Sequence, residues 1–258
     1  MATELKLRIG LQNGKSVVTD SFFTSPLKLG VPNQEGDRLK VMLMMASAGI
    51  LKGDEFVYDI CCGSGTKVLL TEQSYTKIFD TGDGSAKRHQ DIRVEQGASL
   101  YYRPCAAIPF GGSTYDGDIT VKLKDESEFA YADIVTAGRV GMGERFAFHH
   151  YRNRVCVEIG DMPVWLDHCL LEPDVMNLEE LLFFDGYTHQ GTFYYYGKKE
   201  KQEQLLEWHL KKREDLEKVI SCGITEALEG ICVRVLAHTA QDIEEVFAQI
   251  AELLKLER

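Results

Sequence analysis

Proline is scarce in this sequence, and the long apolar runs of a membrane protein are missing. Six prolines among 258 residues are too few for a disordered or linker-dominated chain. No stretch of eighteen apolar residues occurs, and the run from Val41 to Met45 is followed by Ser47 and Gly49. The first residues lack a basic region followed by an apolar run, so no secretory signal is predicted. We expect a soluble, folded protein without a membrane partner.

Positive charge is also in short supply. The chain has 29 Lys and Arg residues against 40 Asp and Glu residues, which gives a formal net charge of -11. Such a charge repels the phosphate backbone that supplies most non-specific affinity for nucleic acid, so we expect no nucleic-acid partner. An acidic balance instead favours cations or basic protein surfaces.

Metal-binding and redox motifs are absent. The seven cysteines are an odd number scattered through the chain, which does not fit a disulfide framework and favours a reducing cytoplasm. There is no Cys-x-x-Cys, no His-Glu-x-x-His and no pair of histidines at helical ligand spacing. The adjacent pairs Cys61-Cys62 and His149-His150 would point to opposite faces of a strand. A closed zinc site is therefore not predicted.

Nucleotide-binding loops are not found either. In residues 62–67 a Thr precedes Lys67 and a strand follows, whereas a phosphate loop needs Lys before Ser or Thr and leads into a helix. Residues 141–143 lack the third glycine of a dinucleotide fingerprint. Both segments are predicted to be turns between strands, and no bound cofactor is expected.

The dominant pattern up to about residue 172 is an alternation of apolar and polar side chains. It begins at residues 5–11, where Asn13-Gly14 follows as a strong hairpin signal, and it recurs at residues 119–124 and 155–159. Clusters of turn residues separate these stretches, with hardly a helix between them. The pattern predicts a mainly β protein and argues against a doubly wound α/β sheet.

The pattern changes in the last third of the chain. Residues 198–220 and 241–256 are predicted helices, the second with apolar residues on one face. Between them, residues 224–228 and 231–237 are predicted to form a hairpin, and residues 192–196 a strand in front. We therefore expect a β-rich body in residues 1–190 and a small C-terminal β-α-β-β-α part in residues 191–258, packed on the body.

The segment Asp185-Gly186-Tyr187-Thr188-His189 contains an acid, an alcohol and an imidazole. Five contiguous residues do not usually converge into a triad, so a turn with exposed aromatic neighbours is the favoured interpretation. Phe184 and Tyr187 are accordingly predicted to bind a partner. A soluble hydrolase or isomerase that uses His189 or His150 with Asp185 remains an alternative.

Two segments carry the most informative pattern. Residues 48–56 contain a glycine turn and an acidic pair, Gly53-Asp54-Glu55, and residues 71–79 end in Thr76-Lys77-Ile78-Phe79. Together they resemble the signature of the UreD family of urease accessory proteins, called UreH in some lineages, and the chain is closest in character to the UreH branch. Ala48 and Lys52 replace two glycines that are usual in that signature.

The resemblance covers about residues 20–190 in ordered sequence. It includes the aromatic, Pro and Leu-Lys segment at 22–28, the Gly-Ala-x-Leu strand at 97–100, the Gly-Arg and Gly-Glu stretch at 137–146 and residues 185–189. No single motif is decisive, but several in the right order are unlike a chance match. The C-terminal part matches in character rather than by motif.

The resemblance implies a fold and a set of partners. The fold is a large stacked-sheet or β-helix-like body with a small C-terminal α+β part that contains two helices. The function is that of a non-enzymatic urease maturation scaffold, which binds a UreF-type accessory protein, through it a UreG-type GTPase, and the urease apoprotein. The complex helps to deliver nickel to the urease active site.

The resemblance also implies an acidic internal passage for nickel in transit, with no permanently bound cofactor. By position, the matching acids are Asp54, Glu55, Asp133 and Asp167. Carboxylates suit transit because nickel binds nitrogen and sulfur sites tightly, whereas shallow sites let an ion enter and leave. An acid beside a glycine turn can equally be solvated or bond a local amide. A third class of protein, a metal store, would bind nickel tightly on its own.

Overall fold

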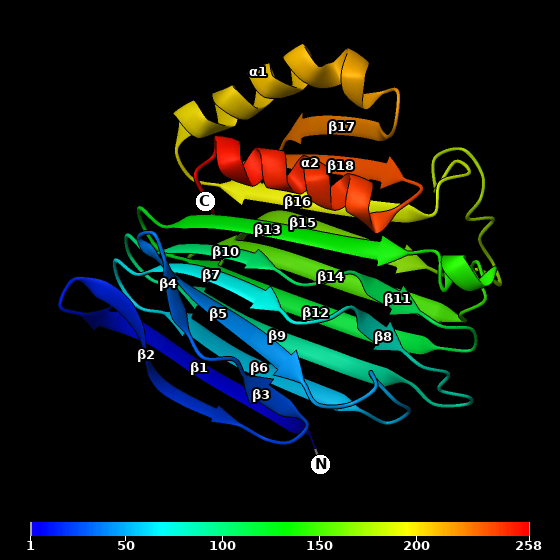
Figure 1. The fold of residues 1–258 in the computed structure, drawn as a ribbon, viewed down its shortest axis with the longest axis horizontal. Helices are drawn as coiled ribbons and strands as arrows, with labels where there is room; N and C mark the ends of the chain where they lie inside the picture. The colour runs from blue at the N-terminus through cyan, green and yellow to red at the C-terminus, as the bar shows by residue number, and fades with distance from the viewer. Residues whose placement is uncertain (1, 258) are drawn as a thin grey trace.

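The computed structural model describes residues 2–257 and consists of two stacked β-sheets with helices on one side (Figure 1). Sheet A has seven strands in the order β15-β14-β12-β9-β6-β1-β2. Their bounds are Met162–Leu171, His150–Ile159, Thr114–Leu123, Ala86–Val94, Glu55–Cys62, Thr3–Gln12 and Lys15–Phe23. The mainly β fold class predicted from the sequence is confirmed.

Sheet B has eleven strands, eight of them in the order β17-β18-β16-β13-β10-β7-β5-β3. These span Ser221–Glu226, Ile231–Ala237, His189–Tyr196, Glu128–Thr136, Ser99–Arg103, Lys67–Glu72, Arg38–Met45 and Leu27–Leu29. Three short strands pair beside this path: β4 (Asn33–Glu35), β8 (Thr76–Ile78) and β11 (Ala107–Pro109).

The chain winds between the two sheets. From β5 to β14 the long strands alternate between sheet B and sheet A. From β7 on, each of them pairs in parallel with the previous long strand of its own sheet. Parallel neighbours need a crossover, and here the other sheet supplies it. This arrangement is the stacked-sheet, β-helix-like body that the family resemblance implied.

The N-terminal hairpin follows directly from its turn. β1 and β2 pair antiparallel, with Gln12 opposite Lys15. The two residues between them, Asn13 and Gly14, have φ of 51° and 74°, which is the geometry that two-residue hairpins prefer. The hairpin predicted at Asn13-Gly14 is confirmed.

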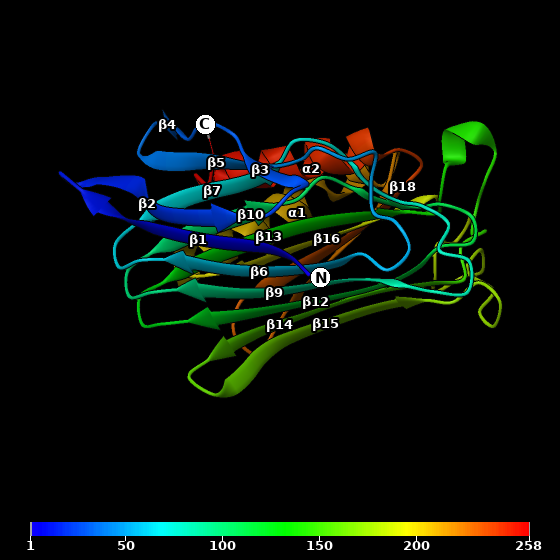
Figure 2. The ribbon, with the colours of Figure 1, turned by 90° about the horizontal axis from the view of Figure 1, so that it is seen from below.

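The C-terminal strands continue sheet B. β16 pairs with β13 along its whole length, and β18 pairs with β16. The helices α1 (Lys199–Leu216) and α2 (Ala240–Leu253) lie on the far side of sheet B from sheet A, and η1 (Val140–Met142) projects from one end (Figures 1 and 2). In residues 2–257, no helix has the length and apolar character that crossing a membrane requires.

Two apolar cores result from this layering. One lies between the sheets, where side chains such as Phe56, Val121 and Phe129 are buried. The other lies between sheet B and the helices, where α2 buries Ile243, Phe247 and their neighbours. No helix of residues 2–257 covers the outer face of sheet A (Figure 2).

Candidate functional site

Polar side chains interrupt the core between the sheets. These side chains alternate along their strands with residues that face outward. They point toward the opposite sheet, as the buried apolar side chains of the same strands do. We call this set the internal polar layer. It consists of Glu72, Arg88, Gln90, Asp133, Asn153, Asp167 and Arg234.

Glu72 and Arg88 form a buried ion pair. Arg88 Nη1 lies 3.1 Å from Glu72 Oε1, and the two side chains are only 7% and 10% exposed. The guanidinium also faces the rings of Phe56 and Tyr58, and its Nε has no hydrogen-bond partner among the described residues. The pair thus leaves the buried Arg88 Nε–H without a hydrogen-bond acceptor among residues 2–257.

Asp133 lies on β13 and accepts a hydrogen bond from Asn153 Nδ2 at 2.8 Å. Burial is the main cause that raises the pKa of this carboxyl to about 6. The charges of Asp167 and Glu72 contribute to the increase, and the Asn153 hydrogen bond opposes it. Asp133 is therefore an acid whose charge changes just below neutral pH.

Asp167 and Arg234 form an ion pair near the open edges of the two sheets. Asp167 comes from β15 and Arg234 from β18, and Arg234 also donates to Thr192 Oγ1. The Asp167 side chain is 11% exposed, while that of Arg234 is 42% exposed. The structure thus brings Asp133 and Asp167 close enough to influence one another.

Three small cavities meet at the Glu72–Arg88 pair. The inner cavity, of about 30 Å³, includes Gln90, Tyr115, Asp133 and Asn153 in its lining. A second, the signature cavity, has about 40 Å³, and a third, the side cavity, has about 80 Å³ and extends to Phe247 of α2. Arg88 lines the first two and Glu72 the last two. Each has room for one or more water molecules.

The two signature segments line the signature cavity together. Ile50 N donates to Lys77 O at 2.8 Å, and Phe79 N donates to Ile50 O at 2.9 Å. At Gly49 a Cβ would lie 2.5 Å from the Lys77 carbonyl oxygen, so only glycine allows this close approach. The signature therefore builds one wall of a cavity that reaches Glu72 and Arg88.

Asp54 and Glu55 lie outside the internal polar layer. Asp54 Oδ2 accepts a hydrogen bond from Leu51 N at 2.8 Å, which closes the turn around Gly53. Glu55 is exposed at the start of β6. The four acids expected from the sequence thus separate into two at a surface turn and two between the sheets.

The aromatic residues predicted to bind a partner have different surroundings. Phe184 is fully buried and its ring packs against that of Phe146 at 5.0 Å between centroids. Tyr187 is partly buried against His238. The exposed large apolar residues next to them are Leu181, Leu182 and Phe183. In this conformation Phe184 therefore stabilises the core and is not available to a partner.

The residues of the hydrolase alternative do not meet. His150 contacts Glu172 and Asp116, while His189 Nδ1 contacts the Thr188 hydroxyl. Among residues 2–257, no hydrogen bond or ion pair joins Asp185 to either histidine. The geometry therefore provides no acid–imidazole pair of the expected kind.

The cysteines are all unpaired. Burial raises the pKa of Cys105 to about 11 and that of Cys169 to about 12, so both remain protonated thiols at neutral pH. Within the described part of the chain, no group of three or more His, Cys, Asp and Glu side chains is arranged to hold a metal ion.

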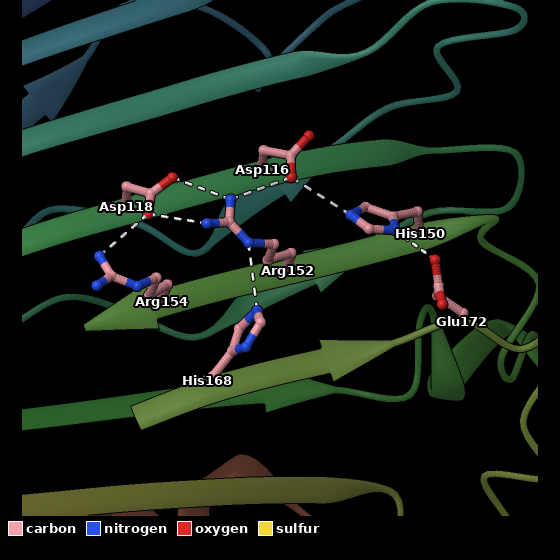
Figure 3. A network of polar contacts seen from close by, with 7 residues as sticks. All are labelled: Asp116, Asp118, His150, Arg152, Arg154, His168 and Glu172. Atoms are coloured by element: carbon pink, nitrogen blue, oxygen red, sulfur yellow. Dashed lines mark hydrogen bonds and ion pairs between the residues drawn. The ribbon is translucent and has the colours of Figure 1, made fainter. Parts of the chain in front are cut away.

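A second charged network lies on the outer face of sheet A (Figure 3). Arg152 donates to Asp118 at 2.9 and 3.0 Å and to Asp116 at 3.3 Å. His150 lies between Asp116 and Glu172, at 3.4 and 3.0 Å. These side chains are about a quarter to a third exposed, so water screens their charges.

Sequence reasoning missed five members of the internal polar layer: Glu72, Arg88, Gln90, Asn153 and Arg234. A signal was present, because Arg88 and Gln90 occupy the inward phase of a strand that continues with Ile92 and Val94. A polar residue at a strand position that matches the buried apolar ones indicates one of two things. Either that part of the strand lies at the protein surface, or a polar site lies inside the protein. Only the structure distinguishes the two.

The chain is similar to known proteins along nearly its whole length. The family model described as UreD urease accessory protein matches residues 1–258. This chain belongs to the UreD family. It is 32% identical over 257 residues to the urease accessory protein UreD of Acetivibrio thermocellus, covering 98% of this chain and 97% of the relative. It is 36% identical over 186 residues to UreH of Helicobacter pylori, covering 72% and 70% of the two chains.

A further UreD-family relative, UreH of Helicobacter hepaticus, is 32% identical over 238 residues, with 92% of each chain covered. The family resemblance drawn from the two signature segments is therefore confirmed. As a member of the UreD family, the chain has a role in urease maturation.

Proposed function

We propose that this UreD-family protein is a non-enzymatic scaffold that lets nickel pass through the internal polar layer on its way to the urease active site. The observation that carries the proposal is the set of three carboxylates, Glu72, Asp133 and Asp167, between the two sheets. Glu72 lines the signature cavity, which both signature segments border, and Asp133 lines the inner cavity, which meets it at Arg88.

The ligand chemistry supports transit. Nickel binds imidazole and thiolate sites tightly, and the thiols nearest the layer, Cys105 and Cys169, are protonated at neutral pH. Carboxylates, amides and water offer weaker sites that an ion can leave. A path lined by such groups conducts the ion and does not store it.

The two arginines keep the layer compatible with a folded core. Each is paired with one acid, Arg88 with Glu72 and Arg234 with Asp167. The hydrogen-bond partners of Asp133 among residues 2–257 are neutral, namely the Asn153 amide and the Ile134 backbone. Asp133 is thus the carboxylate that offers a passing cation an uncompensated charge once it is ionised. We assign it the central position on the path.

The proposal includes the expected partners. In the cytoplasm, the scaffold binds a UreF-type accessory protein, through it a UreG-type GTPase, and the urease apoprotein. Exposed apolar residues support contacts with other proteins, and Leu182 is 93% exposed, Val175 77% and Leu181 69%. With Phe184 buried, these residues and Tyr187 are the better candidates for a partner surface in this region.

The test compares nickel in urease matured with different variants. Asp133→Asn, co-expressed with urease and the accessory proteins, is expected to give assembled complexes but urease with at least about tenfold less nickel, because a neutral amide removes the free charge. Asp116→Asn, on the outer face of sheet A, is the matched control and should leave nickel unchanged.

A further arm, Asp54→Ala with Glu55→Ala, asks whether the surface turn also helps the ion. Reduced nickel in urease matured with this double variant would show that the turn is part of the path. Normal nickel in Asp133→Asn, with that protein present in the complex, would refute the internal route.

A further inference from the structure

A large groove lies at the end of the body where η1 projects, on the right in Figure 1. It has a volume of about 590 Å³ and lies between β11, the segment that holds η1 and the first residues of α2. Of the cavities described here it is much the largest, because the three at the Glu72–Arg88 pair have 80 Å³ or less.

The groove is lined mainly by apolar side chains. Ile108, Phe110 and Val140 are among its lining residues. Met142 and Tyr75 also line it and are 80% and 44% exposed. Contact between such large apolar surfaces and water is unfavourable in free energy. Such a surface is typical of a site that another protein covers.

The lining of the groove includes basic side chains and no acidic ones. None of its sixteen lining residues is acidic, although the chain has 40 Asp and Glu residues. Lys77 and Arg139 are positively charged, while burial lowers the pKa of His189 and keeps it neutral. Lys77 forms no ion pair within residues 2–257, whereas Arg139 pairs with Glu144.

Three acids lie beside the groove without lining it, and one of them, Glu244 of the side cavity, is close enough to Tyr75 to help raise the pKa of that phenol. Glu144 bonds Arg139 and the Gly111 amide, and Asp242 contacts the Thr239 hydroxyl. The first turn of α2 lines the same groove with Ala240 and Gln241, so the positive end of the helix adds to the charge of Lys77. The groove therefore fits an apolar segment that also carries carboxylates.

The groove adjoins the signature cavity. Tyr75 and Lys77 line both, and the signature cavity reaches Glu72 and Arg88 of the internal polar layer. A protein bound in the groove would therefore sit beside one mouth of the proposed nickel path.

We infer that the groove is the docking site for a carboxylate-bearing, apolar segment of the accessory partner that supplies the ion. This inference rests on the proposed function, in which a UreF-type protein links the scaffold to the nickel-supplying GTPase. The inference adds the location of the partner's binding site, because a partner that supplies nickel must bind where the ion can enter the path.

The experiment measures the affinity of the full chain for the purified UreF-type partner of the same organism by isothermal titration calorimetry. Lys77→Glu and Met142→Asp are each expected to raise Kd at least about tenfold, because they place a negative charge in the groove. Lys87→Glu and Met162→Asp introduce the same changes at exposed positions on sheet A and are expected to alter Kd less than about twofold.

The outcomes separate the inference from the proposed function. Tight binding by the wild-type chain with unchanged Kd in both groove variants would overturn the docking site and leave the scaffold role standing. No binding by the wild-type chain would overturn both. A self-associated chain that Met142→Asp converts to a monomer, seen by light scattering, would show a second copy as the occupant and also overturn the inference.

Discussion

Strand β14 separates two charged regions of very different character. Arg152 and Arg154 point outward into the network of Figure 3, while Asn153, between them in sequence, points inward and holds Asp133. The outer network contains as many Asp, Glu and Arg side chains as the inner layer, and more contacts join them. Its members nevertheless remain partly exposed, whereas Glu72 and Arg88 are 10% exposed or less.

The two regions show that a large number of charged contacts does not by itself indicate a functional site. Water and salt weaken attraction between exposed charges, so the outer network is expected to contribute little to stability or specificity. A charge between two sheets has a desolvation cost that only a partner can offset. A polar layer retained against that cost is a stronger indication of function.

The largest expected effect comes from separating the inner pair. Arg88→Met leaves the Glu72 carboxylate buried without a cation, so we expect a loss of about 3–5 kcal/mol in the free energy of unfolding. Urea titration followed by circular dichroism measures it. Arg88→Met combined with Glu72→Gln should recover much of the loss, and equal stabilities of the single variant and the wild type would contradict the burial argument.

The next effect depends on pH. The pKa of Asp133 is raised from an unfolded value near 3.9 to about 6 in the folded state, so ionisation destabilises the fold as pH rises from about 4 to 6. Asp133→Asn removes this penalty. We expect the variant to gain about 1–3 kcal/mol relative to the wild type between pH 4 and pH 7.

Urea unfolding of both proteins at four pH values between 4 and 7 measures this difference. A constant difference across that range would mean that Asp133 titrates as an ordinary surface acid. The internal layer would then resemble the outer network in its electrostatics.

The smallest effect is expected on the outer face of sheet A. Arg152→Met removes the centre of the network in Figure 3, yet we expect a loss of no more than about 1 kcal/mol, because its partners can be solvated. The loss should shrink in 0.5 M salt. A loss as large as that of Arg88→Met would abolish the distinction between the two regions.

Local features of the fold could be predicted from the sequence. Asn13-Gly14 gave the first hairpin, and the apolar face of residues 241–256 gave α2. The winding of the strands could not be predicted by periodicity, because it depends on pairs such as Glu55 with Lys87 that are far apart in sequence. Family resemblance supplied that architecture.

The site was predictable only in part. Asp54 and Glu55 were conspicuous because they follow a glycine turn, and Asp54 does bond a turn amide. Asp133 and Asp167 were found through resemblance, and alternation alone would have assigned them to either face. Arg88 and Arg234 were missed because their role depends on the acids that the opposite sheet or a distant strand brings to them.

The most direct test of the internal route is the pH dependence of nickel transfer from the loaded accessory complex to apo-urease, measured with a chelator in solution. With the wild-type scaffold and with the outer control Asp116→Asn, the transfer rate should fall as pH decreases through about 6, because Asp133 gains a proton. With Asp133→Asn, the rate should be low and should lack this inflection. An identical pH profile for Asp133→Asn and the wild type would contradict the internal route.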